Sequence, residues 1–257
     1  MTSIFPVADD MAEYRHLGNA PITEALIDLR VRFPAEFQVE KFSSLRETLH
    51  DQYPNVDTRK SIEGEMEIGG GKLRQSLRDT GIHGYVFKSL DNTKVAQFRK
   101  DGFTFSRLKP YTCWEDISAE AKNLWKLYVA KASPELVTRI AVRYINQLNI
   151  PLPIDDLARY LTVPPRVPDN VPQEISTFFS RVVVHDLEQD IAANIIQVLQ
   201  GSSMPNHVAI ILDIDVYKQK ESGFEESDIW LTFERLRDLK NRIFFDSITE
   251  ETVRLYK

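Results

Sequence analysis

The chain has 257 residues, of which 42% are hydrophobic and 27% charged, as is ordinary for a soluble globular protein of one large or two small domains. Its 38 acidic and 32 basic residues give a net charge of -6, which argues against a dedicated nucleic-acid binder, because such proteins neutralise phosphates with Lys and Arg. A single cysteine excludes a disulfide scaffold, and the lack of a secretory leader or of an apolar run near ~20 residues predicts a cytoplasmic protein without a membrane segment.

The first half of the chain predicts a strand, a helix and then a run of short strands. We expect an irregular lead-in at 1–21. Residues 25–33 then alternate apolar and charged side chains, which is the pattern of a half-buried strand. Apolar residues at helical spacing predict a helix at about 38–52. Residues 55–108 then show the short alternating runs and glycine turns of an antiparallel sheet.

Two glycine-containing segments predict turns within that run of strands. Asp101-Gly102 lies between alternating segments at 94–100 and 103–108, which is a strong hairpin signal because the tight turn needs a positive φ. A second turn is predicted at Gly69-Gly70-Gly71. The amides of three glycines can also hold a phosphate, but no helix is predicted to begin behind them, which favours a plain turn.

The second half predicts a similar succession of elements. A helix at about 114–132 is followed by a long strand at 136–150, which repeats the alternating arginines of the first strand. Six prolines at 151–172 exclude a sheet interior and predict a surface connection with a short helix at about 154–161. The remaining residues predict three strands and a final helix, at 175–187, 190–200, 206–218 and 227–245.

This order of elements predicts the fold class. Each half shows a strand, a helical piece, several strands and a long helix, so we expect an α+β fold, a mainly antiparallel sheet with the long helices packed on one face. We also expect a tandem duplication, with repeats at 22–133 and 134–257 and equivalent strands at 25–33 and 136–150. The alternative is an accidental likeness, because any α+β chain can be cut into two such halves.

Three short motifs stand out along the chain. They are Asn19-Ala20-Pro21-Ile22-x-Glu24-Ala25-Leu26-Ile27-Asp28, Arg143-Tyr144-Ile145-Asn146 and Phe244-x-x-x-Ile248-Thr249. With them the chain resembles, over nearly its whole length, a sporadically distributed and functionally uncharacterised family of bacterial and archaeal proteins. The resemblance implies a patchily distributed prokaryotic protein, as is common for defence-associated and toxin–antitoxin genes, and it supplies no catalytic residues.

Motifs of catalysis and cofactor binding are absent from the sequence. There is no phosphate-binding loop, dinucleotide-binding glycine motif, H-E-x-x-H or G-x-S-x-G, so we predict no cofactor and no catalytic residue. His185-Asp186 has the chemistry of a metal-ligand pair, although a turn at a strand end explains it better. Cys113 stands where a helix begins and a thiol pKa can fall, although a structural cysteine beside Trp114 explains it better.

Asp213 and Asp215 are the best acidic candidates. At strand spacing both carboxylates point to the same face, where they can bind Mg²⁺ or Mn²⁺ and support phosphodiester chemistry. A third acid is needed for such a site, and Glu188 and Asp190 are near only in sequence. The alternative is a polar sheet face balanced by neighbouring arginines.

Four arginines complement these aspartates. Arg30 and Arg32 lie on the polar face of the first strand, and Arg139 and Arg143 lie on the polar face of its counterpart. We expect all four to share a face with the two aspartates, and we take the six as candidate ligand-binding residues. The face is then either a ladder of cross-strand salt bridges or a concave groove whose unpaired donors bind an anion.

Two functions follow from these observations. The absence of catalytic motifs favours a non-enzymatic binding or interaction protein, whose partner is another protein or a small anionic ligand. The alternative is a metal-dependent enzyme that acts on nucleotides or nucleic acid through Asp213 and Asp215. The sequence leaves the oligomeric state open.

Overall fold

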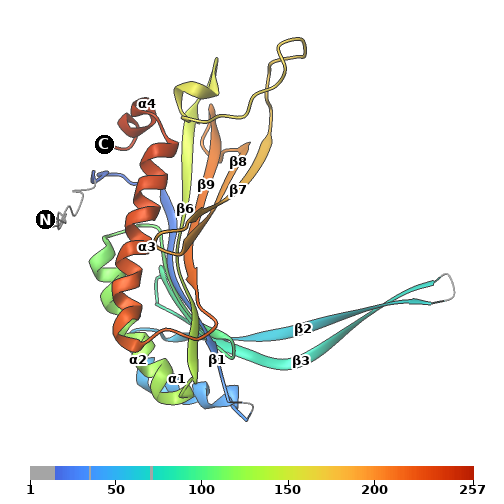
Figure 1. Ribbon diagram of the computed structural model, residues 1–257, viewed down its shortest axis with the longest axis vertical. Helices are drawn as coiled ribbons and strands as arrows, with labels where there is room; N and C mark the ends of the chain where they lie inside the picture. The colour runs from blue at the N-terminus through green and yellow to red at the C-terminus, as the bar shows by residue number, and fades with distance from the viewer. Residues whose placement is uncertain (1–14, 35, 70–71) are drawn as a thin grey trace, which may run out of the picture.

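The computed structural model describes residues 15–34, 36–69 and 72–257, which form one nine-stranded antiparallel sheet with helices. The strands lie in the order β2-β3-β4-β5-β1-β6-β9-β8-β7 (Figure 1). The strands are β1 (Ile22–Arg32), β2 (Asn55–Gly69), β3 (Lys72–Lys88), β4 (Lys94–Arg99), β5 (Gly102–Leu108), β6 (Leu136–Pro151), β7 (Phe178–Asp186), β8 (Ile191–Gly201) and β9 (His207–Gln219). The helices are η1 (Val39–Ser44), α1 (Leu45–Leu49), α2 (Trp114–Ala132), η2 (Leu157–Arg159), α3 (Glu226–Ser247) and α4 (Glu250–Arg254). The predicted α+β class with a mainly antiparallel sheet is therefore confirmed.

The central strands β1 and β6 join the two halves of the chain. They pair antiparallel from Ile22↔Asn146 to Arg32↔Leu136. Each also pairs with the last strand of its own half, β1 with β5 and β6 with β9, and a long helix follows each of those last strands. The order of strands outward from the centre is thus the same on both sides, β5-β4-β3-β2 on one and β9-β8-β7 on the other.

Alternation along β1 separates the core from the second face of the sheet. Ala25, Ile27 and Leu29 have no exposed surface, because they lie in the apolar core. Asp28 and Arg30 alternate with them and therefore point to the opposite side. We call that side, which carries Asp28, Arg139 and Asp215, the polar face.

The two long helices pack against different strands of the sheet. α2 packs against β5 and η1, and α3 packs against β6 and β9. Tyr128 of α2 is at the centre of an aromatic cluster, with its ring centroid 5.2 Å from Phe42, 6.0 Å from Phe103 and 6.2 Å from Phe98. Large aromatic side chains of this kind bury much apolar surface.

The region at 55–108 departs from the predicted short strands. β2 and β3 have 15 and 17 residues and pair as one long hairpin from Asn55↔Lys88 to Gly69↔Lys72, which Figure 1 shows extending away from the rest of the sheet. Of the predicted glycine turn, Gly70 and Gly71 lie outside the described residues.

The predicted hairpin between β4 and β5 is confirmed, and Gly102 has the positive φ expected of it, 154°. Arg99 pairs with Gly102, so Lys100 and Asp101 form the turn and Gly102 begins β5. A Cβ at Gly102 would lie 2.1 Å from the carbonyl oxygen of Leu29 in β1. Glycine is therefore required by the close approach of β1 and β5.

The observed helix boundaries agree with the predicted ones where apolar residues recur at helical spacing over many positions. The helix predicted at 114–132 is found at those residues, and the one predicted at 227–245 extends over Glu226–Ser247. The helix predicted at 38–52 is instead a 3-10 turn and one short α-helix, and only a three-residue 3-10 turn lies within 154–161. Among the described helices, none is long and apolar enough to cross a membrane.

Candidate functional site

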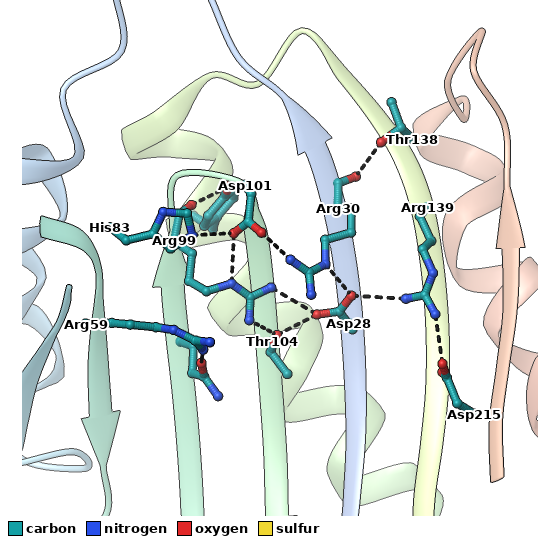
Figure 2. A network of polar contacts seen from close by, with 12 residues as sticks. Asp28, Arg30, Arg59, His83, Arg99, Asp101, Thr104, Thr138, Arg139 and Asp215 are labelled. Atoms are coloured by element: carbon teal, nitrogen blue, oxygen red, sulfur yellow. Dashed lines mark hydrogen bonds and ion pairs between the residues drawn. The ribbon is translucent and has the colours of Figure 1, made fainter. Parts of the chain in front are cut away.

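A network of charged side chains fills the middle of the polar face. Asp28 lies at its centre and accepts hydrogen bonds from Arg30 Nε at 3.0 Å and Arg139 Nη1 at 3.3 Å (Figure 2). Its other carboxylate oxygen accepts from Arg99 Nη2 at 3.1 Å and from the Thr104 hydroxyl at 2.6 Å. The buried carboxylate is thus paired on both oxygens, as burial of a charge requires.

The network continues to the turn between β4 and β5. Asp101 accepts from Arg99 Nε at 3.0 Å and also pairs with Arg30, while His83 Nε2 lies 3.1 Å from it (Figure 2). Burial raises the pKa of Asp101, but the guanidinium groups of Arg99 and Arg30 together bring that pKa below its ordinary value. Asp28, Arg99 and Asp101 were not among the predicted site residues, although the alternation of β1 already placed Asp28 on this face.

The predicted aspartates of β9 are paired with the predicted arginines of β6. Arg139 Nη2 donates to Asp215 at 3.0 Å, and Arg143 holds Asp213 in a two-point contact of 2.8 and 2.5 Å. Burial raises the pKa of Asp215, and the neighbouring arginines only partly oppose this effect. Both carboxylates are therefore committed to guanidinium groups.

The six predicted residues are thus distributed as follows. Arg30, Arg139 and Asp215 belong to one connected network through Asp28, and Arg143 and Asp213 form a pair beside it. Arg32 lies at the exposed end of β1, where its side chain has no hydrogen-bonding or ionic partner among the described residues. The donors that an anion groove would present are largely used by carboxylates, as a salt-bridge ladder requires, while anion binding by these residues stays a prediction.

Metal binding at this face would have to displace arginines. Within the part of the chain that the structure describes, no group of three or more His, Cys, Asp or Glu side chains is arranged to hold a metal ion. Asp213 and Asp215 lie nearest to such a site, but a cation there would compete with Arg143 and Arg139 for the same oxygens.

A second site lies on the core side, where α3, the start of α2, β6 and residues 15–22 meet. It is a cavity of about 160 Å³. Its walls combine apolar and aromatic side chains with polar ones. The cationic members are Arg15, Arg237 and Lys240, and Glu115 is acidic. Residues that line the cavity include Leu17, Tyr111, Cys113, Trp114, Tyr144, Asn146, Arg237, Lys240, Asn241 and Phe244.

Lys240 is the unusual group of this cavity. It is 8% exposed, its Nζ lies 3.8 Å from the centroid of the Tyr144 ring, and it donates a hydrogen bond to Asn241 Oδ1. Among the described residues, no carboxylate lies within salt-bridge distance of this amine. Burial, with a smaller effect of the nearby Arg237 cation, lowers the pKa of Lys240 to about 7.

Aromatic and charged residues frame the amine. The hydroxyls of Tyr111 and Tyr144 are 3.2 Å apart, and burial raises the pKa of Tyr144 well above its ordinary value. Arg237 lies over the Trp114 ring at 5.7 Å. Its ion pairs with Glu115 and Glu234 are both 3.5 Å long, which is beyond the range of a strong charge-assisted hydrogen bond.

Cys113 lines the same cavity and is the N-cap residue that directly precedes α2. The backbone amide of Asp116 lowers its thiol pKa, but burial and the carboxylates of Asp116 and Glu115 outweigh this and raise the pKa above its ordinary value. The thiol is therefore not activated in the way that a helix start alone would predict.

All three sequence motifs of the family resemblance contribute to this cavity. Ala20, Pro21 and Ile22 come from the first, Tyr144 and Asn146 from the second and Phe244 from the third. No sequence pattern points to Lys240 itself, because one lysine on a predicted helix is normally solvated. Its burial follows only from the packing of α3 on β6.

Comparison with known proteins adds nothing to this geometry, since no protein-family model matches the chain and no curated protein is significantly similar to it.

Proposed function

We propose that the protein is a non-enzymatic binding protein for a small organic carboxylate with an apolar or aromatic body, which it holds in the cavity at Lys240. The observation that carries this proposal is a buried ammonium group without a carboxylate partner in the wall of a cavity. A buried charge is costly unless it is paired, and an anionic ligand would supply the missing partner.

The surroundings of Lys240 support a carboxylate with an apolar body. Arg237 retains donor capacity toward the cavity, because its ion pairs are long. The Tyr111 hydroxyl adds a third donor, and Trp114 and Phe244 provide the apolar surface that small-molecule sites commonly use. A cavity of about 160 Å³ accommodates a single small ring with its carboxylate.

The proposal extends to the architecture that forms the site. The matching order of strands on the two sides of β1 and β6 supports a tandem duplication of the units 22–133 and 134–257. Figure 1 shows α2 and α3 running beside each other along the sheet, which supports the packing of both long helices on one face. The cavity then lies where the two repeats meet.

Calorimetric titration with benzoate at pH 7 tests the proposal. We expect saturable binding to the wild-type protein, loss of binding in Lys240→Met, and no change in Lys126→Met, which removes an exposed lysine of α2. Because an anion favours the charged amine, binding should weaken as the pH rises above 7 and should be absent for the uncharged benzamide. Equal affinity of Lys240→Met and wild type, or no binding to wild type, contradicts the proposal.

A second titration, with Mn²⁺, distinguishes the binding protein from the alternative, a metal-dependent enzyme. A cation site at Asp213 and Asp215 predicts saturable binding that is lost in Asp213→Asn. We expect no such binding, because the Asp213 and Asp215 carboxylates are hydrogen-bonded to Arg143 and Arg139.

A further inference from the structure

The sheet ends on one side at β7, a strand that pairs along its whole length with β8. Within the described part of the chain, no strand pairs with the other side of β7. Figure 1 shows β7 at the border of the sheet, away from α3. The N–H and C=O groups on its outer side are therefore oriented to accept another strand.

The side chains of β7 are apolar on both faces. Val182, Val183 and Val184 are 50%, 42% and 39% exposed, and Phe179 is 68% exposed. Proteins usually protect an exposed edge with charge. The opposite edge strand β2 has this protection in its sequence, in which six of 15 residues are charged, whereas β7 has only Arg181 and Asp186.

We propose that β7 pairs antiparallel with β7 of a second copy of this chain, in a register centred on Val183, so that two sheets join into one. A twofold axis perpendicular to the sheet relates the two copies, so the same face of both sheets lies on the same side of the joined sheet. Residues opposite each other then differ by an even number, with Val183 facing Val183 of the second copy.

This register matches the exposed side chains of β7 with each other. It places Val182 opposite Val184 of the second copy. It also places Phe179 opposite Leu187, which follows β7 in the turn to β8 and is 89% exposed. A register centred on Val182 would instead place Phe179 opposite His185 and Val184 opposite Ser180. Only the register centred on Val183 sets every one of these apolar side chains against another.

The polar residues of the strand are also compatible with a second copy. Ser180 faces Asp186, whose carboxylate can accept a hydrogen bond from the hydroxyl, and Arg181 faces His185. Arg181 and Asp186 have opposite charges, so together they add no net charge to the strand. The pairing is independent of the ligand cavity, which is formed by other elements.

Sedimentation of the full-length protein over a range of concentrations tests the pairing. We expect a concentration-dependent dimer for the wild type, a monomer for Val183→Lys and an unchanged dimer for Leu90→Lys, a matched control at another exposed apolar residue. Circular dichroism confirms that each variant is folded. A wild type that stays monomeric, or a Val183→Lys variant that still dimerises, overturns the proposal.

Cysteine cross-linking tests the register separately. In a Cys113→Ser background, Val183→Cys should form an intermolecular disulfide on mild oxidation, because only the central residue faces its own copy. Val182 is adjacent and also exposed, but it faces Val184 of the second copy, so Val182→Cys should cross-link much less. Equal cross-linking of the two variants overturns the register centred on Val183.

Discussion

Replacing Lys240 with methionine should stabilise the protein in a pH-dependent way. Methionine has a similar unbranched shape but carries no charge that must be buried. In the folded chain the pKa of Lys240 falls from about 10.5 to about 7. At about 1.4 kcal/mol for each pH unit, this difference corresponds to on the order of 5 kcal/mol of lost stability when the amine is fully charged.

The sign follows from the protons bound in each state. Between pH 7 and about 10.5 the unfolded chain keeps the Lys240 proton and the folded chain has lost it, so the free energy of unfolding of the wild type rises with pH. Below pH 7 the penalty is fully present, and above about 10.5 it is absent. The advantage of Lys240→Met should therefore be largest below pH 7 and should fall by about 1.4 kcal/mol per pH unit above it.

Urea denaturation from pH 6 to 9.5 measures this difference, since groups that titrate alike in both proteins cancel. Lys126→Met serves as the control, because an exposed lysine should give a difference near zero at every pH. A difference between Lys240→Met and wild type that does not change with pH would refute the reasoning, since it would show that the buried amine is not what titrates.

Two further substitutions probe the sheet. Asp28→Ala should lower the free energy of unfolding in urea by about 3–5 kcal/mol, because it leaves the buried Arg99 without its central partner. The control Asp57→Ala breaks an exposed pair with Lys88 and should cost at most about 1 kcal/mol, and equal effects of the two would contradict a structural role of the network. Gly102→Ala should destabilise the protein by more than about 2 kcal/mol, because the added Cβ clashes with Leu29. In the same assay the control Gly201→Ala should be nearly neutral, because a Cβ there meets nothing within 4 Å. A Gly102→Ala variant of unchanged stability would show that β1 and β5 can separate.

The sequence predicted those parts of the fold that a periodic pattern determines. The boundaries of helix α2 and of strands β1 and β6 could be predicted to within a few residues, because their regular apolar spacing extends over many positions. The length of the β2–β3 hairpin was not predicted. Ile62, Met66 and Ile68 alternate with glutamates, but alternation alone does not determine how far a pair of strands extends.

The candidate sites show the same division. Alternation placed Arg139, Arg143, Asp213 and Asp215 on one face, because period 2 is a property of the strand itself. Which carboxylate each arginine contacts depends on the register between strands, and the register is set by distant parts of the chain. The burial of Lys240 depends on how a helix packs on a sheet, which no local pattern encodes.

The pairing of β1 with β6 has a consequence for how the chain folds during synthesis. The first half contains β1 to β5 and α2, yet one edge of β1 stays unpaired until Leu136–Pro151 has been made. Contacts separated by more than a hundred residues form slowly, because the intervening chain must be closed into a loop first. We therefore expect the emerging first half to expose a long apolar strand edge, and the two halves to reach their final stability in a single cooperative step rather than one after the other.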